Sequence, residues 1–153
     1  KLIMVDSGLT NFLAGIQLEY LRHKELLDTW RGKAAEQIVA QELRTVLDRH
    51  YRERQYFWIR DKKGATAEVD FVWQEGTDII PIEVKAGTNS HLRSLHVFVN
   101  QSDRPVVAVR VWSGPLSVQD AQTPAPEKKP FRLVNLPFYY AGQLDKVIAK
   151  YGR

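Results

Sequence analysis

The sequence contains no cysteine. Without thiols, the chain can form neither disulfide bonds nor zinc sites with thiolate ligands, and this agrees with a reducing cytoplasm. Long apolar runs are also lacking, because no stretch approaches the roughly 20 residues that a membrane-spanning helix needs. No signal peptide is visible either. We therefore expect a cytoplasmic protein that does not enter a membrane.

Two common hydrolytic motifs are missing as well. The four histidines, His23, His50, His91 and His96, do not form the His-Glu-x-x-His spacing of a zinc protease. Ser7 lies in Asp-Ser-Gly, but no nucleophile elbow surrounds it. The sequence therefore offers no support for a zinc protease or for a serine hydrolase of the nucleophile-elbow class.

The composition is that of an ordinary globular protein, with 44% hydrophobic and 26% charged residues. At 153 residues the chain is long enough to bury a substantial core, and we expect one domain over residues 1–153. The net charge is +4 and the pI is about 9.4. This mild basicity permits a nucleic-acid partner without requiring one.

Hydrophobic periodicity predicts an alternation of strands and helices. We expect helices near residues 9–20, 30–50, 91–101 and 143–150, with Asp28 or Thr29 as the N-cap of the second. We expect strands near residues 2–5, 55–60, 67–74, 79–85, 105–112 and 131–136, and a proline-rich loop at residues 121–130. Strands mixed with helices indicate an α/β fold, in which helices cover both faces of a central mixed sheet.

The most informative segments are residues 67–73 and 79–85, which alternate apolar and polar side chains with a period of two. The intervening Glu-Gly-Thr-Asp is a turn signal, so we expect an antiparallel hairpin. If the turn is centred between Gly76 and Thr77, residues whose numbers sum to 153 face each other. Asp70 then lies opposite Glu83, and Glu68 lies opposite Lys85.

Two opposed carboxylates are destabilising unless something holds them together, because like charges on neighbouring strands repel. A hard cation such as Mg²⁺ or Mn²⁺ would do so, since it binds carboxylates together with waters and phosphates. Asp70 and Glu83 are therefore candidate metal ligands. The alternative is a different register, in which both acids belong to ordinary solvated strand faces.

A third acid lies on the helix expected at residues 30–50. Glu36 falls on the apolar stripe of that helix, in line with Val39, Leu43 and Leu47. A carboxylate that faces a core is costly unless it is paired or binds a metal. Glu36 is thus a candidate ligand of a metal or of a water. The alternative is a glutamate that interacts with the helix dipole and points to solvent.

An acid on a first helix, an aspartate on one strand and Glu-x-Lys on the next resemble the PD-(D/E)-x-K nucleases of the restriction-endonuclease-like fold. More narrowly, the chain resembles the C-terminal domain of unknown function of prokaryotic AAA-type ATPases. The similar stretches are residues 1–9, 32–39, 42–43, 56–61, 67–71, 81–87, 92–95 and 136–140. Two departures are Val69, which replaces the proline of the motif, and the loop at residues 121–130.

This resemblance implies a three-layer sandwich and a set of roles. Asp70 and Glu83 would hold Mg²⁺ or Mn²⁺, Glu36 would bind a second ion or position the attacking water, and Lys85 would stabilise developing charge. Glu68 would support the site from nearby, or simply form a salt bridge to Lys85. DNA is the expected partner, contacted at its phosphates by basic residues, unless these are only solvated surface. The candidate basic residues are Lys33, Arg60, Lys62, Lys63 and Arg93.

In the ATPases that the chain resembles, an ATP-binding domain precedes this one. The sequence has no Gly-x-x-x-x-Gly-Lys-Ser/Thr phosphate loop, since Gly32-Lys33 is followed by Ala34. We therefore expect a C-terminal part of a longer protein, with ATP bound by the preceding domain of the same polypeptide. Two functions stay open: a metal-dependent nuclease, or a catalytically silent module that binds DNA or a partner protein and regulates the ATPase.

Overall fold

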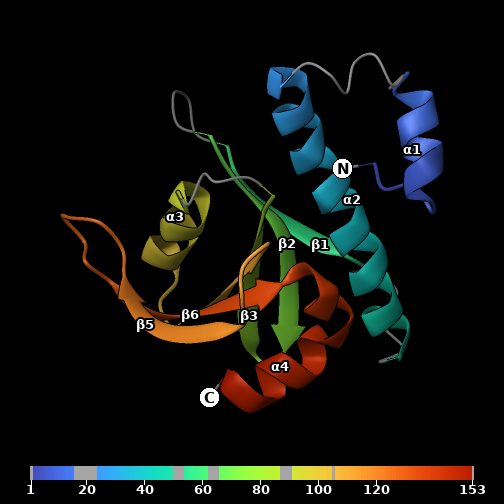
Figure 1. Cartoon of the computed structure of the whole chain (residues 1–153). Helices are drawn as coiled ribbons and strands as arrows, with labels where there is room; N and C mark the ends of the chain where they lie inside the picture. Colours follow the sequence, from blue (N-terminus) through green and yellow to red (C-terminus); the bar gives the residue numbers. More distant parts are fainter. Residues whose placement is uncertain are drawn as a thin grey trace.

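A computed structural model of the chain describes residues 2–15, 24–49, 54–61, 66–86, 91–104 and 106–152. Its centre is a six-stranded sheet with the strand order β1-β2-β3-β4-β6-β5 (Figure 1). The strands are β1 (Tyr56–Arg60), β2 (Ala67–Glu75), β3 (Asp78–Lys85), β4 (Val106–Trp112), β5 (Ser117–Gln122) and β6 (Pro130–Pro137). The three central strands β3, β4 and β6 are parallel, and the other neighbours pair antiparallel.

Helices cover both faces of this sheet. On one face lie α2 (Lys24–Arg49) and α4 (Leu144–Tyr151), whose apolar side chains form the larger core cluster with the sheet. On the other face lies α3 (Arg93–Gln101), which packs with β4 and β6 in a smaller cluster (Figure 1). The expected mixed α/β sheet with helices on both sides is thus confirmed.

The buried side chains explain why these segments adopt their structures. In α2, Ala35, Val39, Leu43 and Val46 recur at steps of three and four residues, so they form one stripe against the sheet. In β3, five consecutive residues from Ile80 to Val84 are buried, as expected of a strand with helices on both faces.

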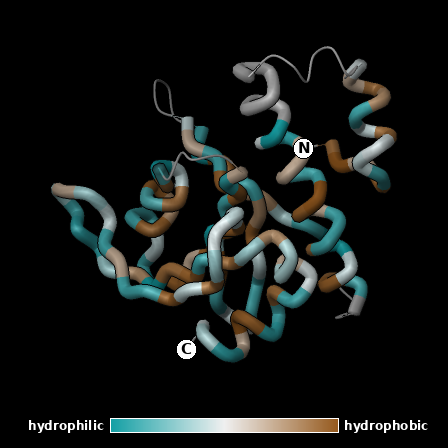
Figure 2. The backbone as a smooth tube through the Cα atoms, in the orientation of Figure 1, coloured by the Kyte–Doolittle hydropathy of each residue, from teal (hydrophilic) through white to brown (hydrophobic). Residues whose placement is uncertain are grey.

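The N-terminal part of the chain differs from the sequence-based expectation. Residues 2–5 form no strand, and the first helix, α1, spans Ser7–Leu13 with Asp6 as its N-cap. Apolar side chains stay exposed here, among them Val5 and Phe12. Figure 2 shows hydrophobic stretches along the backbone of this N-terminal part. These residues have strand-like composition but no neighbouring strand to pair with, which is why the prediction was wrong. The expected helix residues 16–20 lie outside the described part of the chain.

Two further expectations were wrong. The helix α2 begins at Lys24, so Asp28 and Thr29 lie inside it and neither is the N-cap. Strand β5 was not expected at all, because its sequence Ser-Val-Gln-Asp-Ala-Gln is polar and almost wholly exposed. Its hydrogen bonds to β6 make it a strand, and residues 121 and 122 of the expected loop belong to it. The short helix η2 (Phe138–Gln143) was also not expected.

None of the helices in the described ranges is long and apolar enough to span a membrane.

The smaller core cluster makes α3 sensitive to truncation of its central side chain. Leu95 is fully buried there, so Leu95→Ala should lower the free energy of unfolding by about 2–5 kcal/mol through lost burial and the cavity left behind. Ile38→Ala on α2 is the control, since Ile38 is 44% exposed and should change stability by less than about 1 kcal/mol. Urea unfolding measures both. Equal effects of the two substitutions would contradict the packing described for α3.

Candidate active site

The β2–β3 hairpin has the expected register. Its paired residues run from Glu75 opposite Asp78 to Phe71 opposite Ile82, and the numbers of each pair sum to 153. Gly76 lies in the turn with a positive φ of 60°, a conformation that glycine adopts without strain. The turn residues and the alternation of apolar side chains therefore select the same pairing.

Asp70 lies one residue before Phe71, just beyond the last pair of this ladder, and beside an irregularity in the pairing of β2 with β1. Tyr56 of β1 pairs with Val72, but Trp58 pairs with Val69, so two steps along β1 correspond to three along β2. Such an extra residue bends a strand and redirects its side chains. The expected alternation over residues 67–73 persists in the burial of β2, since Val69, Phe71 and Trp73 are buried and Asp70 and Val72 are half-buried. The Asp70 carboxylate accepts a hydrogen bond from the backbone N–H of Val84 at 2.8 Å.

Val84 is the middle residue of Glu83-Val84-Lys85, so the Asp70 carboxylate contacts the Glu-x-Lys segment directly. Glu83 and Lys85 share the face of β3 opposite to the one that Val84 buries in the larger core. Glu83 is 5% exposed, and its Oε1 lies 2.7 Å from Nζ of Lys85. Burial of a carboxylate is costly without such a counter-charge. The structure thus brings Asp70, Glu83 and Lys85 together.

Arg110 is a further charged residue at this site, which the sequence analysis did not single out. It lies opposite Glu83 in the parallel β3–β4 pairing, and its guanidinium stacks 4.2 Å from the ring of Trp112. Burial lowers the pKa of the Arg110 guanidinium below its ordinary value. The signal in the sequence is one charged residue inside the strongly β-branched segment of β4.

Glu36 and Glu68 are the other two acids that the sequence analysis named. Glu36 lies on α2, which packs on the larger core, and its Oε1 is 3.7 Å from Nζ of Lys33 in the preceding turn. Glu68 is exposed and lies opposite Ile59 of β1. Within the described residues, no three histidine, aspartate or glutamate side chains come close enough together to hold one metal ion.

The basic residues considered for phosphate contacts are spread over three elements. Lys33 is exposed on α2, Arg60 ends β1, and Arg93 is the exposed first residue of α3. Lys33 and Arg93 belong to helices on opposite faces of the sheet. Lys62 and Lys63 lie outside the described residues. Among the described basic residues, Lys33 and Arg93 therefore do not belong to one surface.

The donor set at the hairpin suits a hard divalent cation in part. Asp70 and Glu83 provide carboxylate oxygens on adjacent strands, and Mg²⁺ is typically held by one or two carboxylates, with waters and substrate phosphate in the other positions. Within the part of the chain that the structure describes, no third acid completes a site made wholly of protein ligands. The residues present thus fit an ion that is completed by water and substrate.

The hydrogen bond from Val84 gives Asp70 a structural role that can be separated from its charge. Asp70→Asn keeps an oxygen acceptor for the Val84 N–H and removes one of two neighbouring negative charges, so it should leave stability unchanged or raise it. Asp70→Ala removes the acceptor and should cost about 1–3 kcal/mol. Thermal and urea unfolding in EDTA compare the two. If Asp70→Ala is as stable as Asp70→Asn, the hydrogen bond does not hold the site.

A known protein family matches this part of the chain. The model of a domain of unknown function, DUF4143, matches residues 31–139. The match begins in α2 and ends in η2, so it includes the hairpin with Asp70, Glu83 and Lys85, as well as Arg110. No curated protein matches the sequence. Because the family model covers most of the chain, the protein belongs to the DUF4143 family of domains of unknown function.

Proposed function

We propose that this domain is a metal-dependent nuclease of the restriction-endonuclease-like fold, which hydrolyses phosphodiester bonds in DNA. One observation carries the proposal: the buried carboxylate of Glu83 pairs with Lys85, and the carboxylate of Asp70 binds the residue between them. Two acids and one lysine at this spacing are what a phosphodiesterase of the PD-(D/E)-x-K type would use. The order of a long helix, three antiparallel strands, a helix and a parallel strand supports the same fold.

Each residue of the group has a chemical task in this proposal. Asp70 and Glu83 would hold the cation, which supplies charge neutralisation at the phosphate and activates the attacking water. Lys85 already lies 2.7 Å from Glu83, so its ammonium group would stabilise negative charge that develops on the phosphate oxygens. Arg110, opposite Glu83 on β4, would add a second positive charge beside the scissile phosphate.

We also infer that ATP is bound by a separate domain of the same polypeptide. This inference rests on the resemblance to the C-terminal domain of AAA-type ATPases and on the absence of a phosphate loop from this sequence. ATP would then influence this domain through the separate ATP-binding domain, without binding at Asp70 and Glu83.

A second function is favoured by the position of Glu36. Its side chain is near Lys33, and the described residues contain no group of three metal ligands. A nuclease fold that had lost cleavage would keep the compact Asp70–Glu83–Lys85 arrangement for stability and use its surface to bind DNA or a partner protein. The nuclease assay below separates these two functions.

The nuclease proposal predicts cleavage that needs a divalent metal and both hairpin acids. The protein should cleave at least one of duplex, branched or single-stranded DNA or RNA in Mg²⁺ or Mn²⁺, and none of them in EDTA. Asp70→Asn and Glu83→Gln should each reduce cleavage by about 100-fold or more, because each removes a ligand charge. Gel analysis of end-labelled substrates measures the rates.

The matched control is Asp78→Asn, the same chemical change at the exposed start of β3. It should leave the cleavage rate close to that of the unaltered protein. Metal-dependent cleavage that persists in Glu83→Gln would place the activity elsewhere. Absence of cleavage on every substrate, together with measurable DNA binding, would establish the silent binding module instead.

A further inference from the structure

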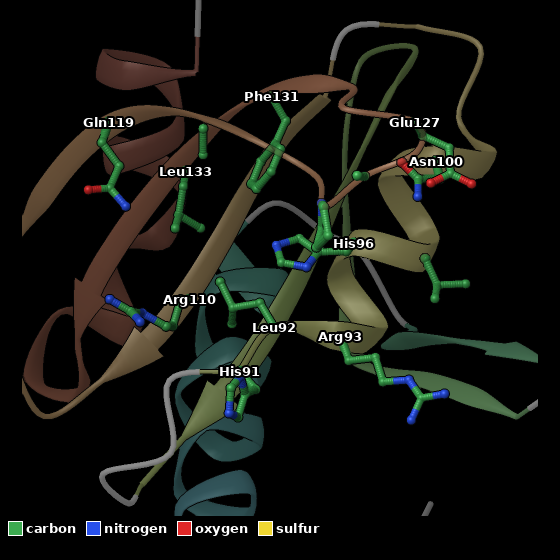
Figure 3. Close-up of a pocket in the computed structure, with 14 residues that line it drawn as sticks. His91, Leu92, Arg93, His96, Asn100, Arg110, Gln119, Glu127, Phe131 and Leu133 are labelled. Atoms are coloured by element: carbon green, nitrogen blue, oxygen red, sulfur yellow. The ribbon is translucent and has the colours of Figure 1, made fainter.

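A cavity of about 830 Å³ lies between α3 and the strands β4, β5 and β6, on the same face of the sheet as Glu83 (Figure 3). It is lined by α3 and the two residues before it, by Arg110 of β4, by β5 and β6, and by the loop that joins β5 to β6. This volume is typical of pockets that bind small molecules. The hairpin acids themselves do not line it.

The charged residues of the lining are mostly basic. Arg93 and Arg110 are cationic, His91 and His96 are the two histidines, and Glu127 is the only acid among the described residues that line the cavity. Burial lowers the pKa of His96, so at neutral pH this ring is uncharged and can both donate and accept a hydrogen bond. The cavity therefore favours an anionic ligand.

The cavity has two different ends along the direction of the strands. Arg110 marks one end, where it pairs in register with Glu83 on one side and Asn135 on the other. The other end lies roughly four residues, or about 13 Å, back along β4. There Asn100 lies in the last turn of α3, and Glu127 lies in the loop before β6.

Two contacts join the end of α3 and the start of β4 to the β5–β6 loop and the start of β6 at this second end. Val106, at the start of β4, pairs with Phe131 near the start of β6. Lys129 in the same loop binds the backbone carbonyl of Ser102, directly after α3. Figure 3 shows Arg110 on one side of the cavity, with Asn100 and Glu127 on the other.

A buried polar atom lacks a partner at each end. Within the described residues, no hydrogen-bond partner reaches Nε of Arg110, and none reaches Oδ1 of Asn100. Buried polar groups are nearly always satisfied, so such atoms in the wall of a cavity indicate a ligand or water that pairs with them. One is a cationic donor and the other is a neutral acceptor.

The wall between the two ends is apolar and aromatic. Phe131 and Leu133 of β6 form one side, and Leu92, directly before α3, faces them (Figure 3). The ring of His96 meets that of Phe131 edge-on at 5.8 Å between centroids. A flat ring system is the kind of ligand body that such a wall accommodates.

We propose that this cavity binds a nucleotide, with its phosphate at Arg110 and its base at Asn100. The phosphate would accept hydrogen bonds from the Arg110 guanidinium, and an N–H edge of the base would donate to Oδ1 of Asn100 and to the carboxylate of Glu127. Guanine suits this end, because it presents two adjacent N–H donors to the two acceptors. The ligand is either a free nucleotide or the terminal nucleotide of a strand.

This site goes beyond the proposed cleavage activity and does not need it. Arg110 connects the two, because it lies opposite Glu83 and also lines the cavity. Binding at Arg110 and Asn100 requires no divalent cation, so titrations in EDTA can succeed or fail whatever the outcome of a cleavage assay.

The test is a titration of GMP into the protein in EDTA, followed by calorimetry and by shifts of backbone NMR signals. GMP should shift signals of α3 and of the β5–β6 loop. Arg110→Gln and Asn100→Ala should each weaken binding about tenfold or more, since each removes a hydrogen bond to a buried group. Having two variants from different elements protects the test against one that fails to fold.

The matched control is Arg132→Gln, the same change on β6, where Arg132 pairs with Asp120 instead of lining the cavity. It should leave the dissociation constant of GMP unchanged. A 5′-phosphorylated hexanucleotide that begins with guanosine forms the second arm. Binding of GMP identifies a free nucleotide, and binding of the hexanucleotide alone identifies a strand end. No binding of either at millimolar concentration, or binding that both cavity variants retain, would overturn the proposal.

Discussion

The register of the β2–β3 hairpin fixes both the core and the candidate site. In this register, Phe71 and Trp73 of β2 and Ile80 and Ile82 of β3 enter the larger core cluster. A slip by one residue would turn each of these side chains to the other face, so the register is strongly specified by burial. The same register brings the Asp70 carboxylate to the backbone of the Glu-x-Lys segment, where it accepts the N–H of Val84. The charges are thus held in place by the hydrophobic pairing next to them.

The hairpin could be predicted from the sequence because its signals are local. The alternation of residues 67–73 and 79–85 and the glycine in the turn specify the pairing without knowledge of the rest of the fold. The sequence predicted that Asp70 lies beside Glu83 and Lys85, but it did not predict which atom the Asp70 carboxylate contacts. The extra residue between Val69 and Val72 depends on pairing with β1, and the hydrogen bond from the N–H of Val84 to Asp70 lies next to it.

Other parts of the structure depend on contacts between distant segments. Strand β5 has neither hydrophobic alternation nor burial, and its pairing with β6 makes it a strand. The apolar stripe of α2 that packs on the sheet was predicted from the spacing of its residues. That spacing does not predict which neighbour the side chain of Glu36 contacts. Glu36 lies 3.7 Å from Lys33, a contact that the spacing alone did not predict. Arg110 reaches Glu83 only through the parallel pairing that the α3 crossover creates.

A titration with Mn²⁺, followed by paramagnetic broadening of NMR signals, shows whether the hairpin acids bind a metal ion. Broadening should centre on Asp70, Glu83 and Val84, and Glu83→Gln should greatly weaken it. The exposed acid Asp78 provides the comparison, since Asp78→Asn should leave the broadening unchanged. Absence of localised broadening at millimolar Mn²⁺, both alone and with a phosphorylated oligonucleotide, would contradict the account.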